Sequence, residues 1–141
     1  MALHPLYARM GTTIFEHMSA LCRDGQRINL GQGFPDDSGP PELIEAAARA
    51  LRDRSNQYPP SAGVPELRDA VARFYAETQS LALTREQVIV TSGATEAIAA
   101  AVLAVVQPGD EVILFAPAYD AYAPMVRRAG GVPVFVPLIP P

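Results

Sequence analysis

The spacing of hydrophobic positions changes close to residue 84. Before that point, apolar residues recur every three or four positions, in stretches that open at a threonine or a proline. This spacing is typical of amphipathic helices that bury one face. Threonine is a common N-cap and proline is favoured at the first helical position, so the pattern predicts where each helix begins. We expect helices that start at Thr12 or Thr13, at Pro40–Pro41 and at Pro65.

After residue 84, short and continuously apolar runs alternate with helical stretches. The order is strand, helix, strand, helix, strand, over residues 87–91, 94–106, 111–115, 120–129 and 132–136. Continuously apolar strands joined by helices are typical of a parallel sheet buried on both faces. We therefore expect an α/β fold. Residues 85–141 would form the start of a mostly parallel three-layer αβα sheet domain, and residues 1–84 a mostly helical arm before it.

Composition limits the functional class. The chain has 141 residues, of which 49% are apolar and 18% charged, as in a packed globular domain. The formal net charge of −4, without a basic run, argues against nucleic acid and anionic membranes as partners. The first residues form no signal peptide, and the longest apolar window is too short to span a bilayer. Because Cys22 is the single cysteine, we expect a reducing cytoplasm and no cysteine-based metal site.

All eleven positively charged side chains are arginine, and the sequence contains no lysine. Codon preference accounts for most of this bias, but its chemical consequence is the same whatever the cause. Without a lysine amine, no Schiff base can form on this chain, and the lysine of a nucleotide-binding P-loop is missing. We therefore expect none of these 141 residues to be the catalytic residue of a Schiff-base reaction.

The segment 91–96 (TSGATE) is the strongest candidate for a binding site. It joins a predicted strand to a predicted helix, whose first N–H groups have no partner within the helix. These donors and the positive end of the helix dipole favour an anion such as phosphate. Gly93 would let the anion approach the backbone, and the Thr95 hydroxyl would add a donor. On spacing alone, the alternative that Ser92 or Thr95 only caps the helix stays open.

Three tyrosines and a glycine are weaker candidates. Tyr119 and Tyr122 follow the second predicted strand, at the edge where parallel sheets bind ligands, and an aromatic ring there can stack on a planar ligand. Their i, i+3 spacing also fits ordinary helix packing. Tyr58 lies in a loop rich in proline and serine, which favours contact with a ligand or partner. Around Gly33 the spacing favours a close-packed turn, because Asp36 replaces the third glycine of a dinucleotide fingerprint.

Four motifs follow one another along nearly the whole chain. They are NLGQGFPD (29–36), NQY with a later glycine and ELR (56–68), TSGATEA (91–97) and PAYDAY (117–122). Together they resemble the first part of a class I aminotransferase of fold type I, which depends on pyridoxal 5'-phosphate. Within that family, the resemblance is greatest to the branch of methionine, glutamine and kynurenine aminotransferases.

The resemblance implies a role in cofactor binding for five residues. The turn that holds the phosphate of pyridoxal 5'-phosphate matches Gly93, Ala94 and Thr95. The aromatic residue that stacks on the pyridine ring matches Tyr119. Tyr58 matches the tyrosine that crosses a homodimer interface to the cofactor phosphate of the partner subunit.

The resemblance also implies a reaction, the transamination between an amino acid and a 2-oxo acid. Gly33 matches the glycine beside the substrate carboxylate. In this family the essential lysine lies further along, as do the aspartate at the pyridine nitrogen and the arginine at the substrate carboxylate. We therefore expect this chain to be the amino-terminal part of such an enzyme and to be inactive alone. A β-elimination lyase of the same fold and a non-catalytic fragment that binds phosphate or cofactor are the alternatives.

Overall fold

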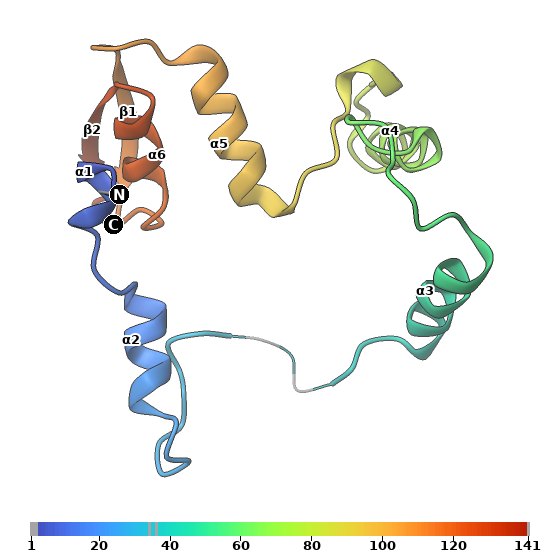
Figure 1. The fold of residues 1–141 in the computed structure, drawn as a ribbon, viewed down its shortest axis with the longest axis horizontal. Helices are drawn as coiled ribbons and strands as arrows, with labels where there is room; N and C mark the ends of the chain where they lie inside the picture. The colour runs from blue at the N-terminus through green and yellow to red at the C-terminus, as the bar shows by residue number, and fades with distance from the viewer. Residues whose placement is uncertain (1–2, 34, 36, 141) are drawn as a thin grey trace. The chain divides into compact units, whose positions relative to one another are not determined.

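The computed structural model describes residues 3–33, 35 and 37–140 and divides the chain into two compact units. One unit is Met10–Tyr58, and the other combines Met1–Arg9 with Pro59–Pro141. Figure 1 shows the helices and strands of both units along the chain. The domain boundary expected between residues 84 and 85 stays a prediction.

The unit Met10–Tyr58 contains two helices, α2 (Ile14–Leu21) and α3 (Pro41–Asp53). Thr13 caps α2, because its hydroxyl oxygen accepts a hydrogen bond of 3.2 Å from the Glu16 N–H. α3 opens on a proline, at a position where a missing N–H leaves no bond unmade. The predicted starts of these two helices are confirmed.

In the other unit, three helices precede the part of the chain in which helices and strands alternate. α1 (Pro5–Ala8) is capped by His4, whose Nδ1 accepts a hydrogen bond of 3.2 Å from the Leu6 N–H. α4 (Pro65–Gln79) begins at the predicted proline. It contacts the 3-10 helix η1 (Arg85–Gln87), in which Thr84 and Gln87 form a reciprocal capping box.

The sheet of this unit has two parallel strands, β1 (Glu111–Ala116) and β2 (Val132–Pro137), paired in register from end to end. They alternate with α5 (Gly93–Val105) and α6 (Tyr122–Arg128). α6 contacts both strands as well as α1 and α5. The chain therefore has the expected α/β fold, and both helices and both strands lie within two residues of their predicted bounds.

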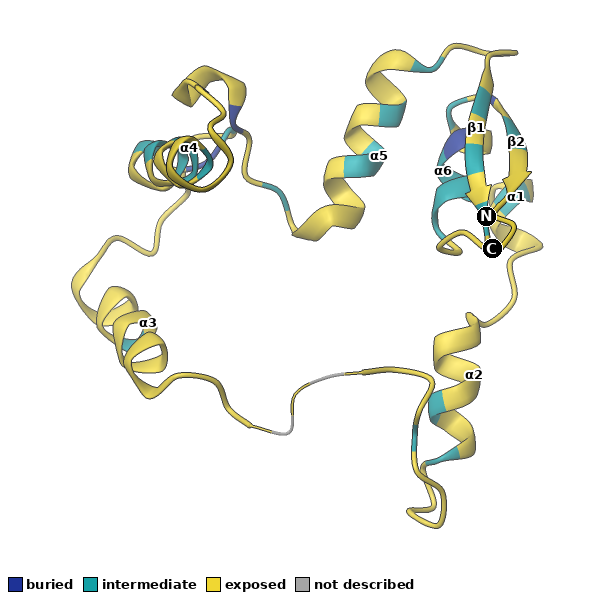
Figure 2. Cartoon of the chain, turned by 180° about the vertical axis from the view of Figure 1, so that it is seen from behind, coloured by how far each residue is buried: buried dark blue, intermediate teal, exposed yellow. Residues whose placement is uncertain are grey.

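The core of this unit is centred on α6. Val126 is only 1% exposed, and Gly131 lies against it. A Cβ on Gly131 would come within 2.7 Å of Val106 Cγ1 and 3.1 Å of Val126 Cγ1, so the close packing here requires glycine. Figure 2 shows how small the buried part is beside the exposed surface.

The predicted strand at 87–91 is wrong. Gln87 ends η1, Val88 is extended, and none of the residues 88–91 pairs with a strand in the described part of the chain. Their polar backbone groups have other partners. The Val90 N–H donates to the Ala62 carbonyl over 3.0 Å, and the Val88 carbonyl accepts a hydrogen bond from the Arg68 side chain. The loop at Ala62 and the Arg68 guanidinium therefore provide the backbone hydrogen bonds of this segment that a neighbouring strand would otherwise provide.

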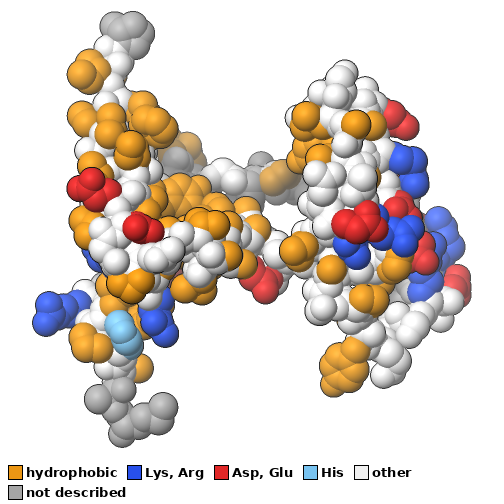
Figure 3. All heavy atoms as spheres, turned by 90° about the horizontal axis from the view of Figure 1, so that it is seen from above, with side chains coloured by type: hydrophobic (Ala, Val, Ile, Leu, Met, Phe, Trp, Pro, Cys, Tyr) orange, Lys and Arg blue, Asp and Glu red, His pale blue; other side chains and the backbone are white. Residues whose placement is uncertain are grey.

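Large apolar side chains remain open to solvent over much of the described chain, as the orange spheres in Figure 3 show. Val105 on α5 is 73% exposed and Ile113 on β1 is 63% exposed. Among the described residues, no helix is both long enough and apolar enough to cross a membrane. The described residues thus leave extensive apolar surface exposed on α5 and β1.

Candidate functional site

The turn between Thr91 and Thr95 brings three of the predicted site residues together at the start of α5. Gly93 has a φ of +77°, a left-handed conformation that favours glycine, and a Cβ built on it would meet nothing within 4 Å. The Gly93 N–H donates to the Thr91 carbonyl over 2.9 Å, and the Thr91 hydroxyl donates to the Gly93 carbonyl over 3.0 Å. The turn is thus closed on itself, while the side on which a Cβ would stand is open.

The hydrogen bonds at this turn show whether the Ser92 side chain caps α5 or whether the first N–H groups of α5 are left for an anion. Ser92 is the N-cap residue of α5, and its side chain makes no capping hydrogen bond. Its N–H donates to the carboxylate of Glu96. Within the described chain, the N–H groups of Ala94 and Thr95 donate to no carbonyl or side chain. Both residues are exposed, so these donors remain available to an external anion.

Tyr119 lies beyond the end of β1, after a cis peptide bond between Ala116 and Pro117. It is 46% exposed, and its ring meets that of Tyr122 edge to face, with centroids 5.5 Å apart and planes at 65°. The tyrosine pair therefore packs edge to face at i, i+3 spacing, with Tyr119 partly exposed. In Figure 1, the last residues of β1 and the first residues of α5 point to the same side of this unit.

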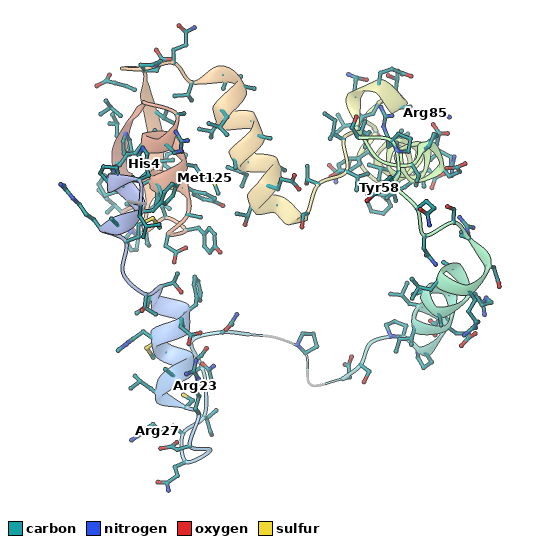
Figure 4. The ribbon with its side chains drawn as sticks, viewed as in Figure 1. His4, Arg23, Arg27, Tyr58, Arg85 and Met125 are labelled. Atoms are coloured by element: carbon teal, nitrogen blue, oxygen red, sulfur yellow. The ribbon has the colours of Figure 1, made fainter. Side chains whose placement is uncertain are left out.

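Tyr58 and Gly33 belong to the unit Met10–Tyr58. Tyr58 is 99% exposed, and Figure 4 shows its side chain projecting from the backbone. No atom comes within 4 Å of a Cβ built on Gly33. The motif residues Phe34 and Asp36 lie outside the described residues. Each of the two candidates is thus open, as a contact with a ligand or partner requires.

The segment before Gly33 is tied to α2. The Asn29 side-chain amide donates to Ser19 Oγ over 3.3 Å, and the Ser19 hydroxyl donates to the Gln32 side-chain oxygen over 3.3 Å. Asn29 Oδ1 also accepts a 3.0 Å hydrogen bond from the Gly31 N–H. A Cβ on Gly31 would lie 3.0 Å from Met18 Cβ, so the backbone is close-packed at Gly31 but not at Gly33, where a Cβ would meet no atom within 4 Å.

Comparison with known proteins decides the family. Residues 26–141 match the family described as aminotransferase class I and II. The chain belongs to this aminotransferase family. Over 130 residues it is 50% identical to a probable N-succinyldiaminopimelate aminotransferase, DapC, of Mycobacterium tuberculosis, covering 92% of this chain and 33% of that protein. Over 137 residues it is 46% identical to the methionine aminotransferase of Escherichia coli, covering 94% of this chain and 35% of the relative.

A solved structure agrees with the sequence comparison. The N-succinyldiaminopimelate aminotransferase of Mycobacterium tuberculosis superposes with a TM-score of 0.90 at 47% identity, over 99% of this chain and 37% of that chain. The resemblance predicted from the four motifs is therefore confirmed. The chain spans about a third of the length of the relatives that it matches.

Enzymes of the aminotransferase family use pyridoxal 5'-phosphate, and the residues at the α5 turn suit its phosphate group. Free N–H donors at a helix N-terminus, a nearby threonine hydroxyl and a glycine without a side chain make up the usual donor set for a phosphate. The predicted phosphate residues Gly93, Ala94 and Thr95 are adjacent and exposed here. Across the described residues, no three His, Cys, Asp or Glu side chains gather as a metal ion would require.

Arg68 is a residue of this chain to which the sequence assigned no role. Its Nε donates to the Val88 carbonyl over 2.7 Å, and its Nη2 donates to the Arg85 carbonyl over 2.6 Å. The guanidinium of Arg85 in turn pairs with the Asp69 carboxylate, with an Nε–Oδ1 distance of 2.8 Å. In the sequence, Arg68 stood out only as part of the ELR motif, and that motif does not indicate that its side chain binds backbone carbonyls.

The charges around α4 and η1 hold one another in their ionised forms. The hydrogen bond from Arg85 lowers the pKa of Asp69 below its ordinary value, and desolvation opposes this effect. The same bond raises the pKa of Arg85. Hydrogen bonds from its own N–H and from Thr84 lower the pKa of Glu86. These groups therefore keep their charges at neutral pH, and the ion pair persists there.

Proposed function

We propose that this chain provides the phosphate site and part of the substrate pocket of an enzyme that transfers an amino group between an amino acid and a 2-oxo acid. The observation that carries this proposal is the open Gly93 turn at the start of α5, in a chain of the aminotransferase family. When bound, pyridoxal 5'-phosphate supplies an electron-withdrawing ring that eases proton removal from the α-carbon of an amino acid.

In this proposal the chain binds and orients the cofactor. The N–H groups of Ala94 and Thr95 donate to the cofactor phosphate, and the Thr95 hydroxyl adds a third donor. The ring of Tyr119 stacks on the pyridine ring. Tyr58, fully open in its own unit, reaches the cofactor phosphate of the partner subunit in a homodimer. The backbone at Gly33 lies beside the substrate carboxylate.

The absence of lysine limits what these residues do. A residue that bonds covalently to the cofactor and moves the proton must come from elsewhere, since no lysine stands in this sequence. We therefore propose that the 141-residue chain alone has no transaminase activity. The chain would work in the cytoplasm, which the free thiol of Cys22 supports. The boundary at residues 84 and 85 would separate the arm from the cofactor-binding domain.

A chimera tests this function. Residues 1–141 would replace the matched region of the Escherichia coli methionine aminotransferase, and transamination of methionine would be measured by the 2-oxo acid formed. We expect the chimera to be active and its Gly93→Asp variant to lose cofactor and activity. Gly109→Asp is the matched control, because Gly109 also has a positive φ and open surroundings. A chimera that folds but is inactive, or that is unaffected by Gly93→Asp, would contradict the proposal.

A second candidate function rests on the same lack of lysine. A chain that retains the phosphate turn without a covalent anchor suits a non-catalytic protein that binds phosphate or cofactor. An inactive chimera that still retains pyridoxal 5'-phosphate through Gly93 would favour it. A β-elimination lyase is distinguished by a second substrate, an amino acid with a leaving group on its β-carbon. The chimera would then release that group together with ammonia and a 2-oxo acid, and it would need no 2-oxo acid as amino-group acceptor.

A further inference from the structure

Arg68 holds the backbone of the segment that leads into the Gly93 turn. Its two hydrogen bonds, of 2.7 and 2.6 Å, end on the carbonyl oxygens of Val88 and Arg85. A guanidinium is planar and rigid, so two of its donors fix both carbonyls relative to one another. The carbonyl of Val88 is thereby held five residues before Gly93.

A second contact holds the same segment two residues further on. The Val90 N–H donates to the Ala62 carbonyl over 3.0 Å, and the Val90 side chain lies directly against Gly63. No strand pairs with these residues in the described part of the chain. The position of the backbone between Val88 and Val90 therefore depends on α4 and the loop before it, and not on a sheet.

The side chain of Arg85 makes a further contact between η1 and α4. It pairs with Asp69, the residue after Arg68, while its own carbonyl accepts a hydrogen bond from Arg68. Figure 4 labels Arg85 beside α4. Two successive side chains of α4 thus bind η1 and the following segment, one through backbone carbonyls and one through an ion pair.

We propose that Arg68 is a positioning residue for the phosphate turn. By fixing the carbonyls of Arg85 and Val88, it sets the direction from which the chain enters the Gly93 turn and hence the direction of the Ala94 and Thr95 N–H groups. Arg68 itself does not touch the anion. The proposal rests on the proposed function only for the identity of that anion as the cofactor phosphate.

The first test needs no ligand. Amide hydrogen exchange of the full chain would be compared between wild type, Arg68→Gln and Arg73→Gln. Arg73 lies on the same helix and is exposed, so its substitution removes an equal charge without touching the two carbonyls. We expect Arg68→Gln to speed exchange at the Val90 and Gly93 amides about tenfold and to leave exchange at the β2 amides unchanged. Arg73→Gln should leave exchange at all of these amides unchanged.

Three outcomes of this experiment would overturn the proposal. Exchange at Val90 and Gly93 could stay at the wild-type rate in Arg68→Gln, which would show that Arg68 does not hold the segment. It could rise equally along the whole chain, which would show a purely structural role. The Val90 amide could also lack protection in the wild type, and then no held segment would exist.

The second test separates positioning from stability. The affinity of the full chain for pyridoxal 5'-phosphate would be divided by its affinity for pyridoxal, which lacks the phosphate. We expect Arg68→Gln to lower this ratio about tenfold, Arg68→Lys to restore part of it, and Arg73→Gln to leave it unchanged. An equal loss of both affinities would overturn the proposal. A wild-type ratio near one would instead contradict the phosphate site of the proposed function, while the exchange result would still decide the role of Arg68.

Discussion

A Cβ built on Gly63 would lie 2.5 Å from Cγ2 of Val90, a separation that carbon atoms of residues distant in the chain do not adopt. Gly63 also has a φ of +99°, where residues with a side chain are strained. Gly63→Ala should therefore destabilise the fold by about 2–4 kcal/mol through strain and overpacking together. Urea unfolding followed by circular dichroism would measure this loss.

Gly109 provides the control for that prediction. Its φ is +92°, but a Cβ there would meet nothing within 4 Å. Gly109→Ala should cost only the backbone strain, about 1–2 kcal/mol. Equal losses in the two variants would show that the contact between Gly63 and Val90 contributes nothing.

The ion pair between Asp69 and Arg85 predicts acid sensitivity. The hydrogen bond from Arg85 lowers the pKa of Asp69 below its ordinary 3.8. A folded-state pKa below the unfolded value means that the stabilisation is complete above the unfolded pKa and is lost as pH falls through the folded one. The difference in unfolding midpoint between wild type and Asp69→Asn should thus shrink below about pH 4. Glu77→Gln, also on α4, is the control. A difference that stayed constant from pH 7 to pH 2 would contradict this prediction.

Val126 is the centre of the small core around α6. It is 1% exposed, so Val126→Ala removes two buried methyl groups and leaves a cavity that should cost about 1–3 kcal/mol. Val105 is 73% exposed, and the same substitution there should cost less than about 0.5 kcal/mol. Thermal unfolding of the two variants would compare the costs directly. Similar changes in melting temperature would mean that Val126 is not the centre of the core.

Tyr119 should affect ligand binding in a way that does not depend on phosphate. If its ring stacks on the pyridine, Tyr119→Ala should weaken pyridoxal 5'-phosphate and pyridoxal alike, by about threefold to tenfold. Tyr119→Phe keeps the ring and should bind both ligands almost as wild type does. Fluorescence titration with each ligand would show the pattern. A loss confined to the phosphorylated ligand would place Tyr119 at the phosphate instead.

Local signals predicted the helices well. Thr13, Pro41 and Pro65 mark helix starts through their own side chains, so the sequence next to each contains the cause. α1 was not predicted although Pro5 stands at its first position, because its four residues are too few to show a helical repeat and its cap is the imidazole of His4. The four motifs were sufficient for the family because each is a local pattern and all four stand in order.

Non-local partners explain what the sequence could not show. The apolar run at 87–91 predicted a strand, yet its backbone bonds to Ala62 and Arg68. Arg68 reaches carbonyls 17 and 20 residues further along the chain, and no spacing rule indicates such acceptors. The phosphate turn was visible because its donors follow one another in sequence. The roles of Tyr58 and Gly33 depend on a partner or a substrate and stay predictions.

The ratio of the affinities for pyridoxal 5'-phosphate and pyridoxal, measured for wild type and Gly93→Ala, tests the phosphate site most directly. With a φ of +77° at Gly93, alanine would strain the turn and place a methyl group on its open side. We predict that wild type prefers the phosphorylated ligand, that Gly93→Ala reduces this preference about tenfold, and that Gly109→Ala keeps it. A Gly93→Ala chain that remains folded with an unchanged preference would contradict the account.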